Sequence, residues 1–243
     1  MARIAVVTGG GTGIGKAIAG ALVTEGLQVV ITGRRLDVLE KACADLGLGT
    51  RAVAFDITDP AAIAGALDAL PQTIDVLVNN AGGSRDGYAR TSDMPDAHAI
   101  RDSWMANLEL NLVGPVMVSE TLKPRLAPDA RIIMIGSVTA RLGGDGYGAA
   151  KAGLECYTVQ LARELGRQGT TVNLVAPGMT AGAEGAAGGL DYSNARWFER
   201  NAANRRIAQP GEVASVVAFL ASPSAGHVTG QVIHVSGGAA RFL

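Results

Sequence analysis

Aromatic side chains are scarce in this chain. Phe, Trp and Tyr together make up only 4% of its 243 residues, although 48% of the residues are hydrophobic. The core must therefore consist of Val, Ile, Leu and Ala side chains, which excludes a core built on aromatic packing. An aliphatic core of this kind is typical of buried parallel strands that are covered by alanine-rich helices.

Cysteine is rare as well, and neither sign of charge is in excess. The two cysteines, Cys43 and Cys156, are far apart in segments with helical patterns, so we expect two free, buried thiols and no disulfide. The 21 basic and 22 acidic residues leave a formal net charge of −1, with no block of like charges. This excludes a protein that binds nucleic acid or an anionic membrane by charge, and no residue pattern predicts a metal site.

A long apolar run and a leader segment are also absent. No run of apolar residues reaches the roughly 18 that a membrane span requires. The first predicted strand begins almost at Met1, which leaves no room for a signal or transit peptide. We therefore expect a soluble, cytoplasmic protein without membrane contacts.

Glycine, in contrast, is plentiful, and residues 8–15 read T-G-G-G-T-G-I-G. The apolar run at 4–7 predicts a buried strand before this stretch, and the residues from Lys16 onward predict a helix after it. A strand, a glycine loop and a helix together direct free N–H groups and the positive end of the helix dipole at an anion. The spacing Gly-x-x-x-Gly-x-Gly therefore predicts a dinucleotide site, with a plain glycine-rich turn as the alternative.

Apolar runs and helical periodicities alternate through the rest of the chain. This alternation predicts a doubly wound, Rossmann-type α/β fold of about seven parallel strands with helices on both faces, in one domain over residues 1–243. Ligands of such sheets bind beyond the carboxyl ends of the strands. The further strands are expected at 28–32, 51–55, 74–78, 131–135, 171–175 and 231–235, and the main helices at 16–26, 36–46, 96–122, 147–166 and 212–221, with a short helix that Asp59 caps at Pro60.

Gly33 and Arg34 follow the second predicted strand, where NAD-binding units commonly carry an acidic residue for the ribose 2′-hydroxyl. Glycine and arginine suit a 2′-phosphate instead, so we expect NADP(H) in preference to NAD(H). The alternative is that Arg34 and Arg35 only begin a solvated helix. Asp56, at the end of the third strand, either caps the local turn or contacts an adenine ring.

Tyr147 and Lys151 lie four residues apart, and therefore on one face of a helix. A tyrosine with the ordinary pKa of about 10 is a poor base at neutral pH, but a neighbouring ammonium group favours the phenolate and lowers that pKa. Such a tyrosine can protonate an alkoxide or deprotonate an alcohol, while Ser137 at a strand end can orient a carbonyl oxygen. The alternative is that Tyr147 and Lys151 merely begin a helix.

These motifs occur in one order along the chain, and together they resemble the short-chain dehydrogenase/reductase family. The resemblance spans essentially the whole chain, and it is specific for the family but much less so for the substrate. The likeness is greatest to the 3-oxoacyl-carrier-protein reductases, whose phrases I-G-S, A-A-K-A-G and V-A-P-G recur here. The residues that carry it are T-G-x-x-x-G-x-G at 8–15, N-N-A-G at 79–82, Asn111 in N-L-V-G, Ser137, Tyr147-x-x-x-Lys151, P-G at 177–178 and the closing T-G-Q-V-I-H-V-S-G-G.

The resemblance implies a nicotinamide cofactor and hydride transfer between it and a carbonyl or alcohol carbon. Tyr147 would be the general acid/base, and Lys151 would hold the nicotinamide ribose and lower the pKa of the tyrosine. Ser137 would position the substrate oxygen, and Asn111 would anchor a water of a proton relay. Asn107, one turn before Asn111, would be a surface or helix-packing residue. Besides Tyr147 and Lys151, the cofactor would contact Gly9, Gly11, Thr12, Gly13, Ile14, Gly15, Arg34, Asp56, Ile57, Asn80, Ala81, Gly82, Pro177, Gly178 and Thr180.

Two features near the expected site depart from the family pattern. Ser137 and Tyr147 are ten residues apart, about three fewer than in most members of the family. Gly182 stands where a threonine is expected, which leaves Thr180 as the candidate for the contact with the nicotinamide carboxamide. A shorter turn removes wall from the substrate pocket, so we expect tolerance of bulky or extended substrates.

The stretch 180–206 is a third departure, because it has little periodicity and is rich in Gly, Ala and Asn. A loop of this length in a compact domain is usually functional, so we expect residues 178–206 to form a mobile lid over the substrate. Trp197 and Phe198 are its expected apolar anchors or, alternatively, core residues of a short helix.

These observations predict an NADP(H)-dependent oxidoreductase similar to 3-oxoacyl-thioester reductases. Its substrate would be a small carbonyl or alcohol compound, or a thioester on a carrier protein. Dehydrogenases of sugars, steroids and other small alcohols share the same phrases and are an alternative. A non-catalytic, dinucleotide-binding regulatory protein is the alternative of another class, which a missing Tyr or Lys would have favoured. Likeness to the family also implies a homotetramer packed through residues 96–122 and 147–166.

Overall fold

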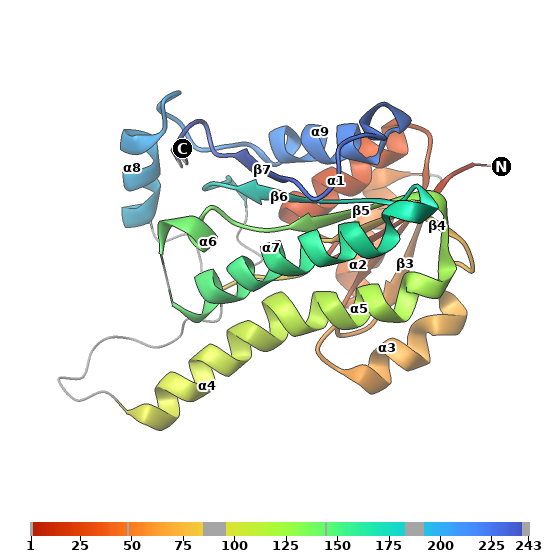
Figure 1. Ribbon diagram of the computed structural model, residues 1–243, viewed down its shortest axis with the longest axis horizontal. Helices are drawn as coiled ribbons and strands as arrows, with labels where there is room; N and C mark the ends of the chain where they lie inside the picture. The colour runs from red at the N-terminus through yellow and green to blue at the C-terminus, as the bar shows by residue number, and fades with distance from the viewer. Residues whose placement is uncertain (1, 48, 85–95, 144, 183–191, 240–243) are drawn as a thin grey trace.

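A single parallel sheet forms the centre of the computed structural model, which describes residues 2–47, 49–84, 96–143, 145–182 and 192–239. Within those residues seven strands lie in the order β3-β2-β1-β4-β5-β6-β7, and every neighbouring pair is parallel (Figure 1). The Rossmann-type fold predicted from the alternating pattern is therefore confirmed. The strands are β1 Ile4–Thr8, β2 Gln28–Gly33, β3 Thr50–Ala54, β4 Ile74–Asn79, β5 Leu126–Ile135, β6 Thr171–Pro177 and β7 Val232–Val235.

Helices cover both faces of this sheet. They are α1 Gly13–Thr24, α2 Leu36–Leu46, α3 Pro60–Ala66, α4 Ala97–Leu108, α5 Gly114–Leu122, α6 Thr139–Leu142, α7 Gly146–Leu165, α8 Tyr192–Asn201 and α9 Pro210–Ala221, with short 3-10 turns at Leu67–Ala69, Lys123–Arg125, Gly166–Gln168 and Pro223–Ala225. None of the helices in the described segments has both the length and the apolar character that a bilayer crossing demands.

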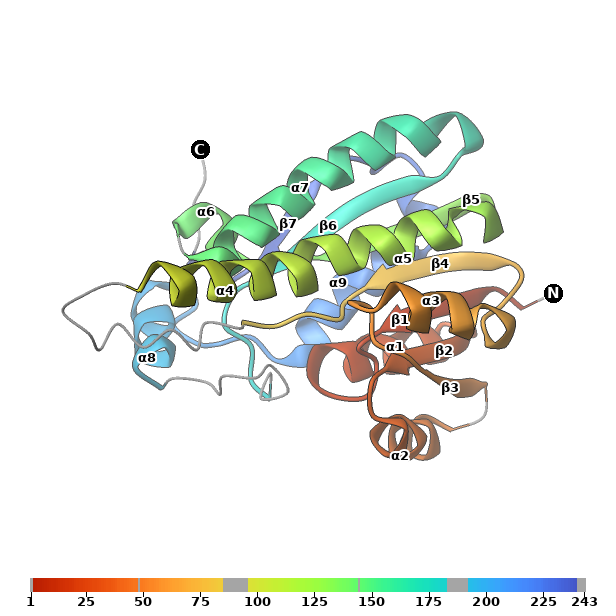
Figure 2. The same ribbon diagram turned by 90° about the horizontal axis from the view of Figure 1, so that it is seen from below.

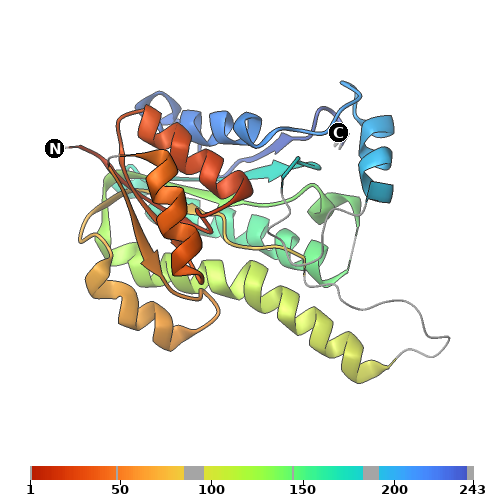
Figure 3. The ribbon, with the colours of Figure 1, turned by 180° about the vertical axis from the view of Figure 1, so that it is seen from behind.

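The two faces form two separate aliphatic cores, because alternate residues of a strand point to opposite sides. Leu77 and Met134 pack in the core under α3, α5 and α7, whereas Val78 and Ile133 pack in the core under α1, α2 and α9. Figure 1 shows α1 and α9 above the sheet with α5 and α7 below it, Figure 2 shows the face with α3, α5 and α7, and Figure 3 shows α1 and α2 from behind.

The strand order reverses between β1 and β4. From β1 the chain adds β2 and β3 on one side, and it then returns to place β4, β5, β6 and β7 on the other side. A reversal of this kind leaves a crevice beyond the carboxyl ends of the two central strands. Thr8 and Asn79 end these strands, so the glycine loop and the N-N-A-G segment begin side by side at the crevice.

Several helices begin at an aspartate that caps them. Asp59, Asp96 and Asp145 each accept a hydrogen bond from the backbone N–H two residues further on, at 2.8, 2.9 and 3.3 Å. A cap satisfies one of the N–H groups that the first turn of a helix leaves without a partner. The cap predicted at Asp59, with Pro60 in the first helical position, is confirmed.

The helix predicted over 96–122 is present, but a π-helical turn, Glu109–Val113, separates α4 from α5. Pro115 follows this turn and has no N–H group to donate to the carbonyl of Asn111 four residues earlier. A π turn widens the helix by one residue and often occurs at functional sites. The periodicity of the sequence did not predict it.

Three predictions of local structure were wrong. β5 begins at Leu126, five residues before its expected start, and its pairing with β4 is irregular near Ile74. The turn between Ser137 and Tyr147 contains the short helix α6. Cys156 is exposed and Cys43 partly buried, so they are free thiols but not buried ones.

The segment 180–206 contains the helix α8, which agrees with the short helix expected around Trp197 and Phe198 as the alternative. Trp197 of α8 is 45% exposed and is therefore not a core residue. The side chain of Phe198 and residues 183–191 lie outside the described part of the chain. The prediction of a mobile lid over 178–206 falls partly on these residues and stays a prediction.

Candidate active site

The glycine loop connects β1 to α1, as the sequence predicts. Thr12 occupies the N-cap position of α1, makes no side-chain capping bond, and is followed by no acidic residue in the first turn. The N–H groups of that turn are therefore left for a ligand, and the positive end of the helix dipole lies at the same place. This arrangement suits the pyrophosphate of a dinucleotide.

Close backbone contacts explain two of the glycines. Gly9 has φ +66°, and a Cβ atom there would lie 2.9 Å from Cα of Ala81. A Cβ atom on Gly15 would lie only 2.1 Å from the carbonyl oxygen of Gly9. The loop therefore folds back on its own helix and on the neighbouring segment at distances that only glycine permits.

The loop is also tied to the N-N-A-G segment after β4. Oγ1 of Thr8 accepts hydrogen bonds from the N–H groups of Asn80 and Ala81, both at 3.0 Å. Nδ2 of Asn80 donates to the carbonyl oxygens of Thr8 at 2.9 Å and Gly9 at 3.1 Å. The two segments on either side of the crevice are thus one hydrogen-bonded unit, in which Asn80 holds the loop.

Arg34 and Asp56 lie at the carboxyl ends of β2 and β3. Nη1 of Arg34 is 4.0 Å from Oδ2 of Asp56, the limit of an ion pair, and its side chain is 60% exposed. Oδ1 of Asp56 accepts from the N–H and the hydroxyl of Thr58, both at 2.9 Å, so it forms the local cap that was one of the two expected readings. The side chain of Ile57 is buried against Gly114, which leaves only its backbone for a ligand.

Tyr147 and Lys151 occupy the first two turns of α7. The ammonium nitrogen of Lys151 lies 5.7 Å from the centroid of the Tyr147 ring. Lys151 is buried and donates to the carbonyl oxygen of Ile135, two residues before Ser137, at 2.8 Å. Because burial disfavours the charged form, the pKa of Lys151 is lowered to about 8.

Asn111 connects the π turn to the segment that follows β4. It exchanges two hydrogen bonds with Gly83, which donates its N–H to Oδ1 at 2.9 Å and accepts from Nδ2 at 3.0 Å. A Cβ atom on Gly82 would lie 2.8 Å from Oδ1 of Asn111 and 3.2 Å from Nζ of Lys151. The N-N-A-G segment, the π turn and α7 therefore meet around Gly82.

Ser137 lies two residues beyond the end of β5. Its Oγ accepts hydrogen bonds from the N–H of Thr139 at 3.2 Å and from the Thr139 hydroxyl at 2.8 Å. The α6 helix, which begins at Thr139, packs beside α7 (Figure 1). Ser137 therefore lies at the carboxyl edge of the sheet with Lys151 and Asn111, as the sequence predicts.

Asn107 of α4 lies inside the molecule, where it packs against the start of α7. It is completely buried, and a Cβ atom on Gly146 would lie 3.3 Å from Cβ of Asn107. Its carbonyl oxygen accepts a hydrogen bond from Nδ2 of Asn111 at 3.1 Å. Of the two roles expected for Asn107, helix packing is confirmed and a surface position is wrong.

The segment after β6 reaches the same edge of the sheet. Pro177 accepts at its carbonyl oxygen from Val138, and the N–H of Gly178 donates to Val235 of β7. Thr180 is buried, and its hydroxyl donates to the carbonyl oxygen of Gly178 at 3.1 Å. Residues 177–180 therefore form a fixed wall beside Ser137.

The sequence analysis missed two groups in this region. The first is the ion pair between Arg141 and Glu155, which joins α6 to α7 with Nη2 2.6 Å from Oε2. The second is the complete burial of Asn107, whose helix-packing role was only one of the two that the sequence left open. The only signal for either was a polar residue at a buried helix position, which the pattern of the sequence alone does not separate from an exposed one.

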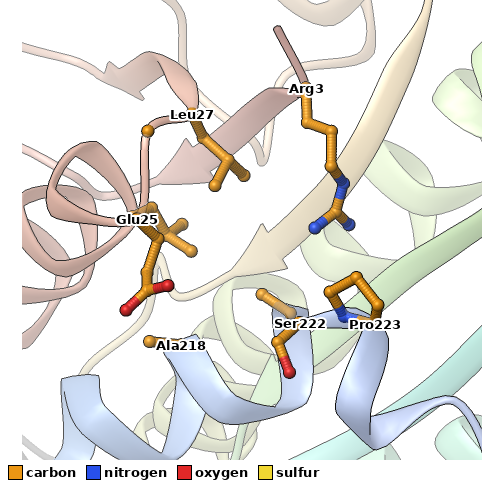
Figure 4. Close-up of a pocket in the computed structure, with 9 residues that line it drawn as sticks. Arg3, Glu25, Leu27, Ala218, Ser222 and Pro223 are labelled. Carbon is orange, nitrogen blue, oxygen red and sulfur yellow. The ribbon is translucent and has the colours of Figure 1, made fainter.

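A cavity of about 320 Å³ lies at the opposite edge of the sheet (Figure 4). It opens between the carboxyl ends of α1 and α9, beside Arg3, which precedes β1. This cavity shares no residue with the candidate site. Its lining residues are Arg3, Leu22, Glu25, Gly26, Leu27, Ala218, Ala221, Ser222 and Pro223.

Known proteins with similar sequences and structures cover almost the whole chain. A family model described as enoyl-(acyl carrier protein) reductase matches residues 9–240. Two 3-oxoacyl-[acyl-carrier-protein] reductases, from Vibrio cholerae and Escherichia coli, are each 35% identical over 250 residues, with 97% of this chain and 96% of each relative covered. The crystal structure of a putative gluconate dehydrogenase from Agrobacterium tumefaciens matches with a TM-score of 0.85 at 27% identity, over 99% of this chain and 97% of that one.

Proposed function

The chain belongs to the short-chain dehydrogenase/reductase family and is an NAD(P)-dependent oxidoreductase, and we propose that it reduces the 3-oxo group of an acyl thioester with NADPH. The observation that carries this proposal is the meeting of three elements at Gly82. Asn111 of the π turn and Lys151 of α7 both lie against this glycine, and Lys151 is one helical turn from Tyr147. In this arrangement a buried cation lies beside a tyrosine at the open edge of the sheet. It is suited to move a proton at a substrate oxygen.

The residues present fit a nicotinamide dinucleotide. The uncapped first turn of α1 and the close approach of Gly15 to Gly9 support binding of the pyrophosphate at the glycine loop. Lys151 would donate to the nicotinamide ribose, and residues 177–180 would line the nicotinamide side. When bound, the cofactor supplies the hydride, and the residues of this chain supply the proton and the orientation of the substrate.

Tyr147 would give the proton to the substrate oxygen. The ammonium group of Lys151 stabilises the phenolate that remains, since an opposite charge at this distance favours the ionised form. Ser137 would donate its hydroxyl proton to the same oxygen, because its own acceptor positions are used by Thr139. Asn111 would anchor a water that returns a proton towards Lys151.

We infer a preference for NADPH over NADH. No carboxylate stands at Gly33, and Arg34 extends into solvent beside the end of β2. An arginine there can form charge-assisted hydrogen bonds with a 2′-phosphate, and a carboxylate would repel it. Oδ1 of Asp56 accepts hydrogen bonds from Thr58, and Oδ2 is 4.0 Å from Nη1 of Arg34, so Asp56 does not neutralise Arg34 at close range.

The acyl thioester is proposed on the relatives named as 3-oxoacyl-[acyl-carrier-protein] reductases. A dehydrogenase of a sugar acid or another small alcohol is the second candidate, supported by the likeness to the putative gluconate dehydrogenase. A non-catalytic, dinucleotide-binding regulator is the third, and the presence of all four catalytic residue types speaks against it. A homotetramer, a cytoplasmic location, a single domain and a lid over 178–206 remain predictions.

Oxidation of NADPH against a panel of substrates tests the proposal. The panel contains a 3-oxoacyl thioester on acyl carrier protein, the same acyl group on coenzyme A, a keto-sugar acid and simple ketones. We expect the highest kcat/KM with one of the two thioesters. A higher kcat/KM with the sugar acid would favour the second candidate, and binding of NADPH without turnover of any carbonyl would favour the third.

A further inference from the structure

The ion pair between α6 and α7 lies just outside the proposed catalytic residues. Nε and Nη2 of Arg141 lie 2.7 and 2.6 Å from Oε2 of Glu155. The side chain of Glu155 is only 9% exposed, whereas that of Arg141 is 49% exposed. Glu155 is one helical turn beyond Lys151 and two beyond Tyr147. The pair therefore fastens the short helix α6 to the helix that carries both of these residues.

The buried carboxylate depends on this arginine. Both nitrogens of Arg141 reach the same oxygen, and Oε1 of Glu155 is buried with no hydrogen-bond partner among the described residues. His234 of β7 is also close, but burial lowers its pKa, so at neutral pH it brings no second positive charge. Removing one partner of a buried ion pair leaves an uncompensated charge and is strongly unfavourable. The position of α6 is thus fixed by the need of Glu155 for Arg141.

The first residue of α6 in turn holds Ser137. The N–H and the hydroxyl of Thr139 both donate to Oγ of Ser137. A hydroxyl group has two acceptor positions and one proton, so these contacts decide the direction in which Ser137 can donate. A shift of α6 would carry Thr139 with it and turn the Ser137 hydroxyl.

We propose that Arg141 and Glu155 are positioning residues, which act through α6 and Thr139 to aim the Ser137 hydroxyl at the substrate oxygen. The inference rests on the proposed function, because it needs Ser137 to contact the substrate. We place its effect at Ser137 and not at the acid/base group, because Thr139 of α6 contacts Ser137 directly and the pKa of Lys151 is lowered by its own burial. Loss of the pair should therefore reduce kcat and leave cofactor affinity unchanged.

Arg141→Ala in two backgrounds tests this. Alone it should lower kcat for the best substrate by about 10- to 100-fold, the usual effect of a displaced orienting group, with the Kd of NADPH unchanged. In a Ser137→Ala background it should cause no further loss, because the residue on which the pair acts is already gone. An unchanged kcat in Arg141→Ala, or an equal loss in both backgrounds, would overturn the proposal.

Two further variants keep the test clear. Arg141→Ala combined with Glu155→Met removes the buried charge together with its partner, so it should fold even where the single variant does not, and it should show the same loss of kcat. A wild-type kcat in this double variant would also overturn the proposal. Glu164→Gln is the matched control, since it removes a carboxylate of α7 that pairs with Lys123 at 2.9 Å on the surface, and kcat should not change.

Hydrogen exchange at residues 139–142 separates this proposal from the proposed function. Faster exchange in Arg141→Ala than in the native protein would show that the ion pair anchors α6, whatever the substrate. If the native protein then turned over no carbonyl compound, the proposed function alone would fail. Unchanged exchange in Arg141→Ala beside an active native enzyme would reject the positioning role alone.

Discussion

Burial of the Lys151 ammonium group affects the chemistry at the scale of single residues. The group must be positively charged to stabilise a phenolate at Tyr147, yet the loss of solvent lowers its pKa to about 8. Within the described residues, Nζ of Lys151 donates one hydrogen bond, to the carbonyl oxygen of Ile135. Lys151 is therefore charged at neutral pH but loses its proton only slightly above it.

This position of the pKa predicts an alkaline limit of activity. As the pH rises through about 8, Lys151 loses its charge, so kcat/KM for NADPH, which reports the free enzyme, should fall. The measurement is the pH profile of kcat/KM between 6 and 10. Lys151→Arg is the control, because its guanidinium stays charged over this range and should remove the fall even if the rate is lower. An identical alkaline limb in that variant would contradict the assignment.

The second prediction at this scale concerns Arg34 and the affinity for NADPH. Arg34→Ala should weaken NADPH binding by about 1–3 kcal/mol, the scale of hydrogen bonds to charged groups, or roughly 5- to 150-fold in Kd. NADH lacks the 2′-phosphate, so its Kd should change little. Titration of cofactor fluorescence with both dinucleotides measures this. NADH binding as tight as that of NADPH, and equally tight in Arg34→Ala, would show that Arg34 only begins a solvated helix.

At the scale of elements, the first βα unit depends on contacts that exclude a side chain. Gly15 in the first turn of α1 faces the carbonyl oxygen of Gly9, and the loop continues into hydrogen bonds with Asn80. The strand, the loop and the N-N-A-G segment form one rigid support. A displaced first turn of α1 would also displace the N–H groups that the pyrophosphate requires.

Gly15→Ala tests this support. The added methyl group has no space beside Gly9, so we expect a loss of about 1–3 kcal/mol in unfolding free energy and a large loss of NADPH affinity. Gly65→Ala is the matched control, since no atom lies within 4 Å of a Cβ atom in this exposed turn of α3. That variant should be neutral or up to about 1 kcal/mol more stable and should bind NADPH normally. Normal cofactor binding by Gly15→Ala would contradict the assigned loop.

Regular elements were predictable where local patterns determine them. Helix α2 has the predicted bounds, Leu36–Leu46, because an amphipathic pattern ends there at Gly47. The early start of β5 was missed because Pro128 and Asp129, the latter at φ +57°, interrupt its apolar pattern. α8 was expected only as an alternative, because it is short and lies between glycine-rich and asparagine-rich stretches.

In the candidate site as well, residues in local motifs were predictable and contacts between distant elements were not. The residues from β1, β4, β5 and α7 were predictable, because each follows a strand or begins a helix in a recognisable motif. The contact of Arg141 with Glu155 and the packing of Asn107 at Gly146 join different elements across the fold. Such pairs depend on tertiary packing, which a single sequence does not specify.

At the scale of the whole molecule, the candidate site draws on both halves of the sheet. The glycine loop, Arg34 and Asp56 belong to β1, β2 and β3, whereas Lys151 and Pro177 belong to the half formed by β5 and β6. A cofactor bound across the crevice would contact both halves at once. Binding should therefore stabilise the entire fold and not one part of it.

Thermal unfolding with cofactor tests this expectation. At 100 times its Kd, NADPH should add about 2.7 kcal/mol to the unfolding free energy, which corresponds to a rise of roughly 5–11 °C in Tm for a chain of this size. NADH at the same concentration should give a smaller rise. Two separate transitions, of which only one moved with NADPH, would contradict a site that spans both halves.

Proton transfer by Tyr147 is the central claim, and turnover by Tyr147→Phe tests it most directly. The measurement is kcat on the best substrate, together with the Kd of NADPH, because the variant removes only the hydroxyl that acts on the substrate oxygen. The account predicts a loss of at least about 10²- to 10⁴-fold in kcat with nearly unchanged NADPH affinity. A Tyr147→Phe enzyme with near-native turnover would contradict it.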